Sequence, residues 1–164
     1  MKSYNLETNA VHPGTKADLE FGSTVCPIYQ TASYEFESPQ ILQDVFEGKE
    51  FGFAYSRIGN PSIAFLEQHI NKLENGRGCV AVSSGMAALS IICDVLTQPG
   101  DHIVSSNSIF GGTHYLLKEL SENQDIAVDF IEGTNLDGFK NAIKDNTKAI
   151  MVEVIGNPKL DVPH

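Results

Sequence analysis

The alternation of short apolar runs with amphipathic runs, from Pro61 onward, is the feature that most restricts the fold of this chain. The apolar runs have the length of buried strands, and the amphipathic runs have the spacing of helices. We expect strands at 79–82, 102–105, 126–131 and 148–154, and helices at 61–73, 86–96, 114–122 and 136–144. Because strands separated by such helices form right-handed crossovers, the sequence predicts an α/β fold with a mainly parallel sheet.

Residues 1–60 differ from the rest of the chain because they show no clear hydrophobic period. They are rich in glycine, proline, serine and aromatic residues. One short amphipathic helix is expected within Pro39–Phe46. A segment of this composition fits an arm that wraps over another surface, so we expect a boundary between an N-terminal arm at 1–60 and a regular domain at 61–164.

The net charge of −10 over 164 residues argues against nucleic acid or an anionic membrane as a partner. No apolar run approaches the length of a membrane span, and the first residues carry no apolar signal segment, which favours a cytoplasmic protein. The three cysteines are odd in number and widely spaced, as expected of free thiols in a reducing compartment. No Cys/His pair has metal-ligand spacing, so no metal site is expected.

The turn Ser83–Gly85 joins the expected strand at 79–82 to the helix that follows. The free N–H groups of that helix N-terminus and two serine hydroxyls would lie beyond the carboxyl end of the strand, where such sheets bind ligands. This arrangement favours an anion, most often a phosphate. A serine that only caps a core helix would give the same local sequence. The loops Asn107–Thr113 and Glu153–Pro158 are expected at the same edge of the sheet.

Four more residues are candidates for ligand binding. Tyr55 and Arg57 would project from one face of an extended segment and could bind two oxygens of one phosphate, although an exposed surface pair is the alternative. Phe110 could stack on a flat cofactor or belong to the core. Asn157 could offer its amide to a ring substituent or simply occupy a turn.

Taken together, the motifs resemble those of the Cys/Met-metabolism family of pyridoxal-phosphate (PLP) enzymes. This is the cystathionine γ-synthase-like branch of the fold-type I superfamily, and the order and spacing of the motifs agree across nearly the whole chain. The segments that carry the resemblance are Tyr55–Ser62, Ser83–Ala88, Phe110–Thr113 and Gly156–Pro158. Those that resemble O-acetylhomoserine sulfhydrylases most closely are Val25–Tyr34, Lys49–Gly52 and Glu153–Val162.

The resemblance implies pyridoxal 5′-phosphate as the cofactor and assigns roles to the phosphate-binding residues. Ser84, Gly85 and Met86 would hold the phosphate at a helix N-terminus. Tyr55 and Arg57 would hold the same phosphate in the site of the neighbouring subunit. The family assembles as dimers paired into tetramers, which gives the N-terminal arm a surface to wrap over.

The resemblance also places Phe110 against the pyridine ring and Asn157 beside the ring hydroxyl. At position 110 the family usually has a tyrosine whose hydroxyl is assigned to proton transfer, and a phenylalanine cannot do this work. The proton transfer then belongs elsewhere, for example to Tyr55 or to the internal lysine, or turnover is altered.

The Schiff-base lysine and the aspartate that faces the pyridinium nitrogen follow the Asn-Pro loop well downstream in the family. Lys148, Lys159 and Asp161 do not stand in the family's setting for either role. The chain therefore resembles an N-terminal fragment, with 61–164 as the first part of the PLP-binding three-layer αβα domain.

The activity that the resemblance implies is that of a transferase of methionine biosynthesis and transsulfuration. An O-acetylhomoserine sulfhydrylase converts O-acetylhomoserine and sulfide into homocysteine and acetate. Cystathionine γ-synthase and methionine γ-lyase are the alternatives within the family. An alternative of another class is an inactive remnant that acts only as an association module.

Overall fold

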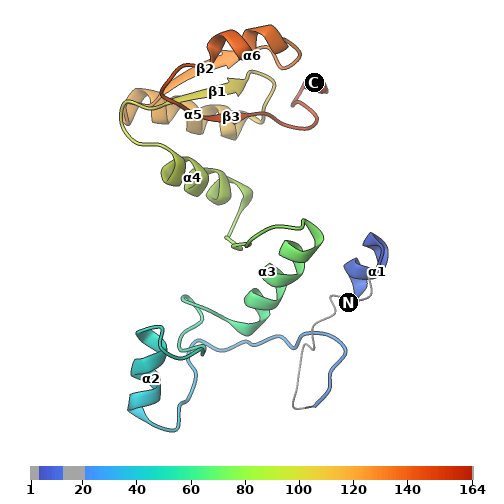
Figure 1. Ribbon diagram of the computed structural model, residues 1–164, viewed down its shortest axis with the longest axis vertical. Coiled ribbons are helices and arrows are strands. Elements are labelled where there is room, and N and C mark those ends of the chain that lie inside the picture. The colour runs from blue at the N-terminus through green and yellow to red at the C-terminus, as the bar shows by residue number, and fades with distance from the viewer. Residues whose placement is uncertain (1–3, 13–20, 164) are drawn as a thin grey trace. The chain divides into compact units, whose positions relative to one another are not determined.

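The computed structural model describes residues 4–12 and 21–163, so parts of the expected arm, 1–3 and 13–20, lie outside the described residues (Figure 1). The chain divides into two compact units, Met1–Ala81 and Val82–His164. The first unit contains α1 (Leu6–Val11), α2 (Pro39–Phe46) and α3 (Pro61–Leu73). The first unit ends at Ala81 and not at residue 60, where the expected arm ends. It includes α3, which contacts α1.

The helices α2 and α3 have the bounds that their sequences predict, because local capping fixes where each begins. Ser38 caps α2 by accepting from the N–H of Ile41, and Asn60 caps α3 by accepting from the N–H of Ser62. A proline occupies the first turn of each helix, where its missing N–H leaves no intrahelical bond unmade.

The second unit is built on a parallel sheet, as expected. Its elements are α4 (Gly85–Leu96), β1 (His102–Ser106), α5 (Gly111–Asn123), β2 (Ala127–Ile131), α6 (Leu136–Ala142) and β3 (Thr147–Met151). The strand order is β2-β1-β3, with both pairs parallel. The predicted α/β class is therefore confirmed.

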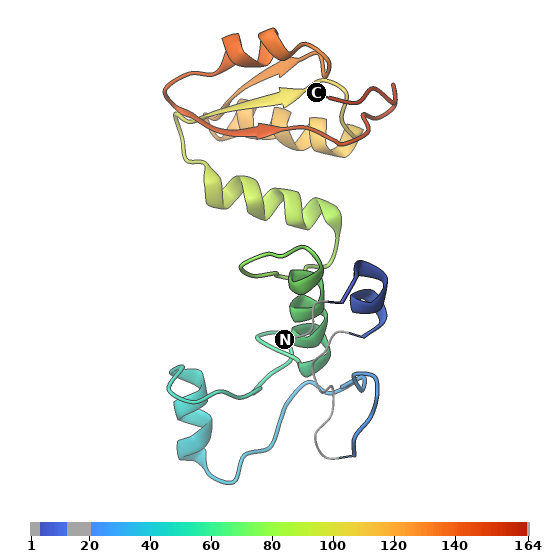
Figure 2. The ribbon, with the colours of Figure 1, turned by 45° about the vertical axis from the view of Figure 1, so that its right-hand side comes forward.

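Helices α5 and α6 cover opposite faces of this sheet, which gives the unit three layers (Figures 1 and 2). The middle strand β1 is covered on both faces, and all five of its residues are buried. The core also includes Leu117 and Leu120 of α5, with Cys93 of α4 as a buried free thiol. The parallel strands direct their carboxyl ends, and the loops that follow them, to one edge.

The prediction of a strand at 79–82 is wrong, because this segment pairs with no strand within the described residues. The side chain of Val80 is 80% exposed. The backbone N–H of Ala81 donates to the carboxylate of Glu67 at 2.8 Å, in place of a bond to a neighbouring strand. An apolar sequence becomes a strand only where a second strand accepts its hydrogen bonds.

Three other expected bounds differ by a few residues. Strand β3 ends at Met151 and not at Val154, α6 ends at Ala142, and α5 begins at Gly111 and not at His114. Within the part of the chain that the structure describes, β3 pairs only with β1, and this pairing ends at Met151. Residues 152–154 therefore have no strand partner among the described residues. No helix in the described ranges is both long and apolar enough to cross a membrane.

Candidate functional site

Two loops meet at the carboxyl edge of the sheet in the second unit. The backbone N–H of Asn157 donates to the carbonyl of Ser108 at 3.3 Å. The backbone N–H of Phe110 donates to Oε1 of Glu153 at 2.7 Å. The loop after β1 and the loop after β3 are thus joined by direct hydrogen bonds, which places Phe110 and Asn157 in one region.

Phe110 is a surface residue and not a core residue, since its side chain is 52% exposed. Its ring lies over the start of α5, where a Cβ on Gly112 would be 2.6 Å from Cε1 of Phe110. The same Cβ would be 3.2 Å from Sδ of Met86, in the first turn of α4. The glycine therefore provides the space in which Phe110 and the α4 N-terminus approach each other.

The N-terminus of α4 is capped by Ser84, whose Oγ accepts from the N–H of Ala87 at 3.1 Å. The cap that we considered as an alternative to phosphate binding is thus formed, but it uses only one N–H group. Within the described ranges the N–H groups of Gly85 and Met86 have no hydrogen-bond acceptor. A Cβ on Gly85 would meet nothing within 4 Å, so the space beside these donors is open.

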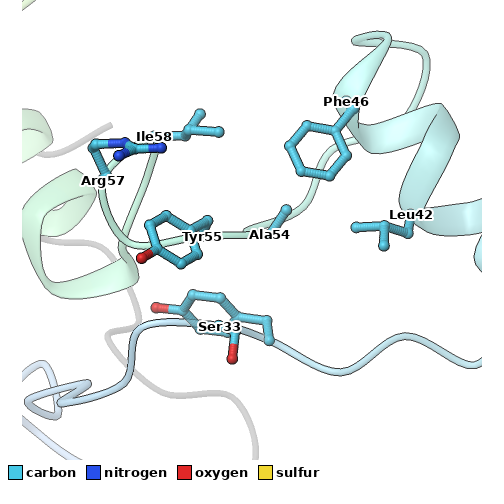
Figure 3. A pocket seen from close by; sticks show the side chains of 8 residues that line it. Ser33, Leu42, Phe46, Ala54, Tyr55, Arg57 and Ile58 are labelled. Atoms are coloured by element: carbon cyan, nitrogen blue, oxygen red, sulfur yellow. The ribbon is translucent and has the colours of Figure 1, made fainter.

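Tyr55 and Arg57 lie together in the first unit, as their spacing predicts. The guanidinium carbon of Arg57 is 5.3 Å from the centre of the Tyr55 ring, which is the geometry of a cation–π contact (Figure 3). Both residues line a pocket of about 340 Å³, together with Leu42 and Phe46 from α2. The pocket thus has a charged and phenolic side and an apolar side.

Asn60 holds the Tyr55–Arg57 segment in place, a role that sequence reasoning missed. Its side chain is buried, and Nδ2 donates to the carbonyl of Tyr29 at 2.9 Å, to Oη of Tyr34 at 3.1 Å and to Oγ of Ser56 at 3.0 Å. An asparagine before a proline at a helix start predicts only a cap. No local signal indicates the three acceptors, because two of them lie 26 and 31 residues away in the chain.

A second polar cluster lies at the amino edge of the sheet, away from the carboxyl edge. Nε2 of His102 is 3.2 Å from Oδ2 of Asp129, and Nζ of Lys144 donates to the same oxygen at 2.7 Å. Nδ1 of His102 lies 2.8 Å from Oγ1 of Thr147. The hydrogen bond from Lys144 lowers the pKa of the Asp129 carboxyl. This cluster connects β1, β2 and β3 through side-chain contacts, so its role is structural.

The family model described as Cys/Met metabolism PLP-dependent enzyme matches residues 7–164. The chain belongs to this family. The resemblance inferred from the motifs is therefore confirmed, and with it PLP as the cofactor of the family.

Curated relatives within the family carry more than one activity. An L-methionine gamma-lyase from Fusobacterium nucleatum subsp. polymorphum is 38% identical over 98% of this chain and 40% of its own length. An O-acetyl-L-homoserine sulfhydrylase from Leptospira meyeri is 35% identical over 98% of this chain and 36% of its own length. The chain thus spans about two-fifths of the length of these relatives.

Solved structures agree with the fold. A structure of metB from Corynebacterium glutamicum is 35% identical and has a TM-score of 0.86, covering 98% of this chain and 40% of that chain. A protein from Campylobacter jejuni described as an O-acetylhomoserine (thiol)-lyase is 34% identical, with a TM-score of 0.84 and the same coverage. That structure contains N′-pyridoxyl-lysine-5′-monophosphate.

The residues at the carboxyl edge fit the phosphate and the ring of PLP. The open N–H groups of Gly85 and Met86, at the positive end of a helix of 12 residues, suit a phosphate dianion. The exposed ring of Phe110 offers a flat apolar surface, and the exposed amide of Asn157 offers a hydrogen-bonding group. This set of donors and one aromatic face fits a phosphorylated pyridine ring.

Proposed function

We propose that the full-length polypeptide is a PLP-dependent O-acetylhomoserine sulfhydrylase, which forms homocysteine and acetate from O-acetylhomoserine and sulfide. The observation that carries the PLP-dependent part of this proposal is the junction of the Ser108–Phe110 loop with the Glu153–Asn157 loop beside the N-terminus of α4. The resemblance of Glu153–Val162 to the corresponding segment of the sulfhydrylases, seen in the sequence, favours this activity over the others in the family.

In this proposal the N–H groups of Gly85 and Met86, with the hydroxyl of Ser84, bind the phosphate of PLP. Tyr55 and Arg57 bind the same phosphate in the site of a neighbouring subunit, so that the complete site needs a homo-oligomer, a dimer or a dimer of dimers. A guanidinium can donate two parallel hydrogen bonds to one phosphate, and the contact with Tyr55 already orients it.

Phe110 stacks on the pyridine ring, and Asn157 donates to the ring hydroxyl. The chemistry that bound PLP supplies is an electron sink for bond cleavage next to the substrate amine. Because Phe110 has no hydroxyl, it holds the ring but moves no proton. Proton transfer to and from the amino-acid substrate then falls to Tyr55 or to the lysine that binds PLP covalently, which this chain does not supply.

Methionine γ-lyase is the second candidate, and the 38% identity to a relative of that name favours it. Both activities cleave a bond at Cγ of a four-carbon amino acid, so the residues described here fit either. An association module without activity is the third candidate. It is favoured by the exposed apolar residues of α4, which are Ile91, Ile92, Val95 and Leu96.

The test uses the full-length protein purified with PLP. We expect bound PLP by its visible absorption, homocysteine formation that requires both O-acetylhomoserine and sulfide, and little methanethiol from methionine. Methanethiol release without sulfide-dependent homocysteine formation would replace the first proposal with the second. A protein that remains colourless with added PLP would contradict both. Borohydride reduction of the 164-residue chain alone should give no PLP–lysine adduct.

A further inference from the structure

Asp161 meets three parts of the carboxyl edge of the sheet, although no motif includes it as a binding residue. Its carboxylate oxygen Oδ1 accepts a hydrogen bond from Oγ of Ser108, in the loop after β1. Its backbone carbonyl accepts from the N–H of Gly156 at 2.7 Å, and the N–H of Leu160 donates back to the carbonyl of Gly156 at 2.8 Å. Asp161 thus closes the turn that contains Asn157 and also ties this turn to β1.

The packing around this carboxylate leaves little freedom. Gly156 is buried, and a Cβ there would be 2.5 Å from Oγ of Ser108. The other oxygen, Oδ2, would be 2.9 Å from a Cβ on Gly133, which follows β2. Both glycines therefore allow the backbone to approach Asp161 closely. The carboxylate lies where the loops after β1, β2 and β3 converge.

The partner of this carboxylate is a hydroxyl that is shielded from water. Ser108 is only 2% exposed, and its side chain donates to Asp161 alone within the described ranges. Removing the acceptor would leave a buried hydroxyl without a partner, which is unfavourable. The hydrogen bond therefore fixes the loop after β1 to the turn at 156–161.

This loop and this turn carry the two residues that would contact the pyridine ring. Phe110 follows Ser108 by two residues, and the N–H of Asn157 donates to the carbonyl of Ser108 at 3.3 Å. We infer that Asp161 is a positioning residue that sets Asn157 relative to Phe110, and so fixes the orientation of the cofactor ring. The inference rests on the proposed binding of PLP at this edge and adds a residue that contacts neither the ring nor the substrate.

The experiment compares four single variants and one double variant of the full-length protein with the wild type. Asp161→Ala and Ser108→Ala each remove the hydrogen bond, Asp161→Asn keeps an acceptor oxygen, and Lys159→Ala is a matched control in the same turn, with an exposed side chain. The readouts are the Kd for PLP by fluorescence titration, the circular dichroism of the cofactor band per bound PLP, and the thermal midpoint of the apoprotein.

We expect Asp161→Ala and Ser108→Ala to raise the Kd for PLP about tenfold, because binding must then also order the turn that carries Asn157. Both should reduce the dichroism of the bound cofactor, because this signal reports the fixed orientation of the ring. The double variant with Asp161→Ala and Ser108→Ala should have a Kd no higher than that of either single variant, since both substitutions remove the same hydrogen bond. Asp161→Asn and Lys159→Ala should keep the Kd within about twofold of the wild type.

Wild-type Kd and wild-type dichroism in Asp161→Ala would overturn the inference while leaving the proposed function intact. A lower thermal midpoint with unchanged dichroism per bound PLP would also overturn it, because the role would then be only structural. If Asp161→Ala does not fold, the same readouts on Ser108→Ala decide. A wild-type protein that binds no PLP would overturn the proposed function and this inference together.

Discussion

The carboxylate of Glu153 accepts a hydrogen bond from the backbone N–H of Phe110 at 2.7 Å, at the N-terminus of α5. Phe110 occupies the N-cap position of this helix but has no side chain that can cap it. A carboxylate from the loop after β3 therefore accepts from the N–H of the N-cap residue, the bond that a glutamate in the first turn of a helix makes in a capping box. The charge of Glu153 also lies favourably at the positive end of the helix.

Glu153→Ala should destabilise the protein by about 1 kcal/mol, which is typical of a lost helix cap. Hydrogen exchange of the Phe110 amide should become faster than in the wild type. Glu153→Gln should retain most of the stability, since its amide oxygen can still accept the bond. Glu132→Ala is the control, because the exposed side chain of Glu132 caps no helix; an equal loss of stability in this variant would contradict the prediction.

Asn60→Asp should destabilise the first unit by about 2 kcal/mol, although it keeps the cap of α3. The carboxylate can still accept from the N–H of Ser62, but it cannot donate to the carbonyl of Tyr29. Chemical denaturation measures the loss. Asn75→Asp, at an exposed position, should change stability little. A harmless Asn60→Asp would show that the buried donor has no structural role.

Arg57→Ala should weaken PLP binding by the full-length oligomer about tenfold or more, because a charge-assisted pair to phosphate is lost. Arg57→Lys should fall between this variant and the wild type, since an ammonium cannot bind two oxygens in parallel. The other arginine of the chain provides the control: Arg77→Ala should leave the Kd for PLP unchanged. Equal effects of the two alanine variants would remove Arg57 from the proposed site.

Phe110→Tyr and Phe110→Ala separate ring stacking from proton transfer. We expect Phe110→Tyr to keep the wild-type affinity for PLP while it changes the pH profile of kcat, because it adds a titratable hydroxyl. Phe110→Ala should lower PLP affinity about tenfold through the lost aromatic contact. If Phe110→Ala binds PLP as tightly as the wild type, the exposed ring does not stack on the cofactor.

The contribution of Asp129 to stability should depend on pH. The hydrogen bond from Lys144 lowers the pKa of Asp129 below the usual value of an aspartate, so the contribution of this carboxylate to stability is present above that usual value. It is lost as the pH falls through the lower pKa of the folded state. The side chain is 43% exposed, so the effect should be only about 0.5 kcal/mol.

Denaturation of Asp129→Asn and of the wild type at pH 7 and at pH 3 measures this dependence. The variant should be less stable than the wild type at pH 7, and the difference should shrink at pH 3. Asp137→Asn is the control, since Asp137 pairs with Lys140 at 3.7 Å on an exposed helix surface. A stability difference for Asp129→Asn that does not change with pH would contradict the assignment.

Much of the fold follows from local chemistry that the sequence displays. The capping residues Ser38 and Asn60, each followed by proline, predict where α2 and α3 begin, because the partners of a cap lie within one turn. The apolar run at 102–105 predicts β1 because it is flanked on both sides by helix-forming segments. The motif spacing also predicts the family, which the family model confirms.

The helices α2 to α6, the three strands of the sheet and the family could be predicted from the residues alone, whereas α1 could not. Contacts between distant segments show that 79–82 forms no strand, that Asn60 donates to Tyr29 and Tyr34, and that Asp161 accepts from Ser108. The physical reason is distance along the chain. A cap or a helical period is satisfied by neighbours a few residues away, whereas these hydrogen bonds join residues 26 to 53 positions apart.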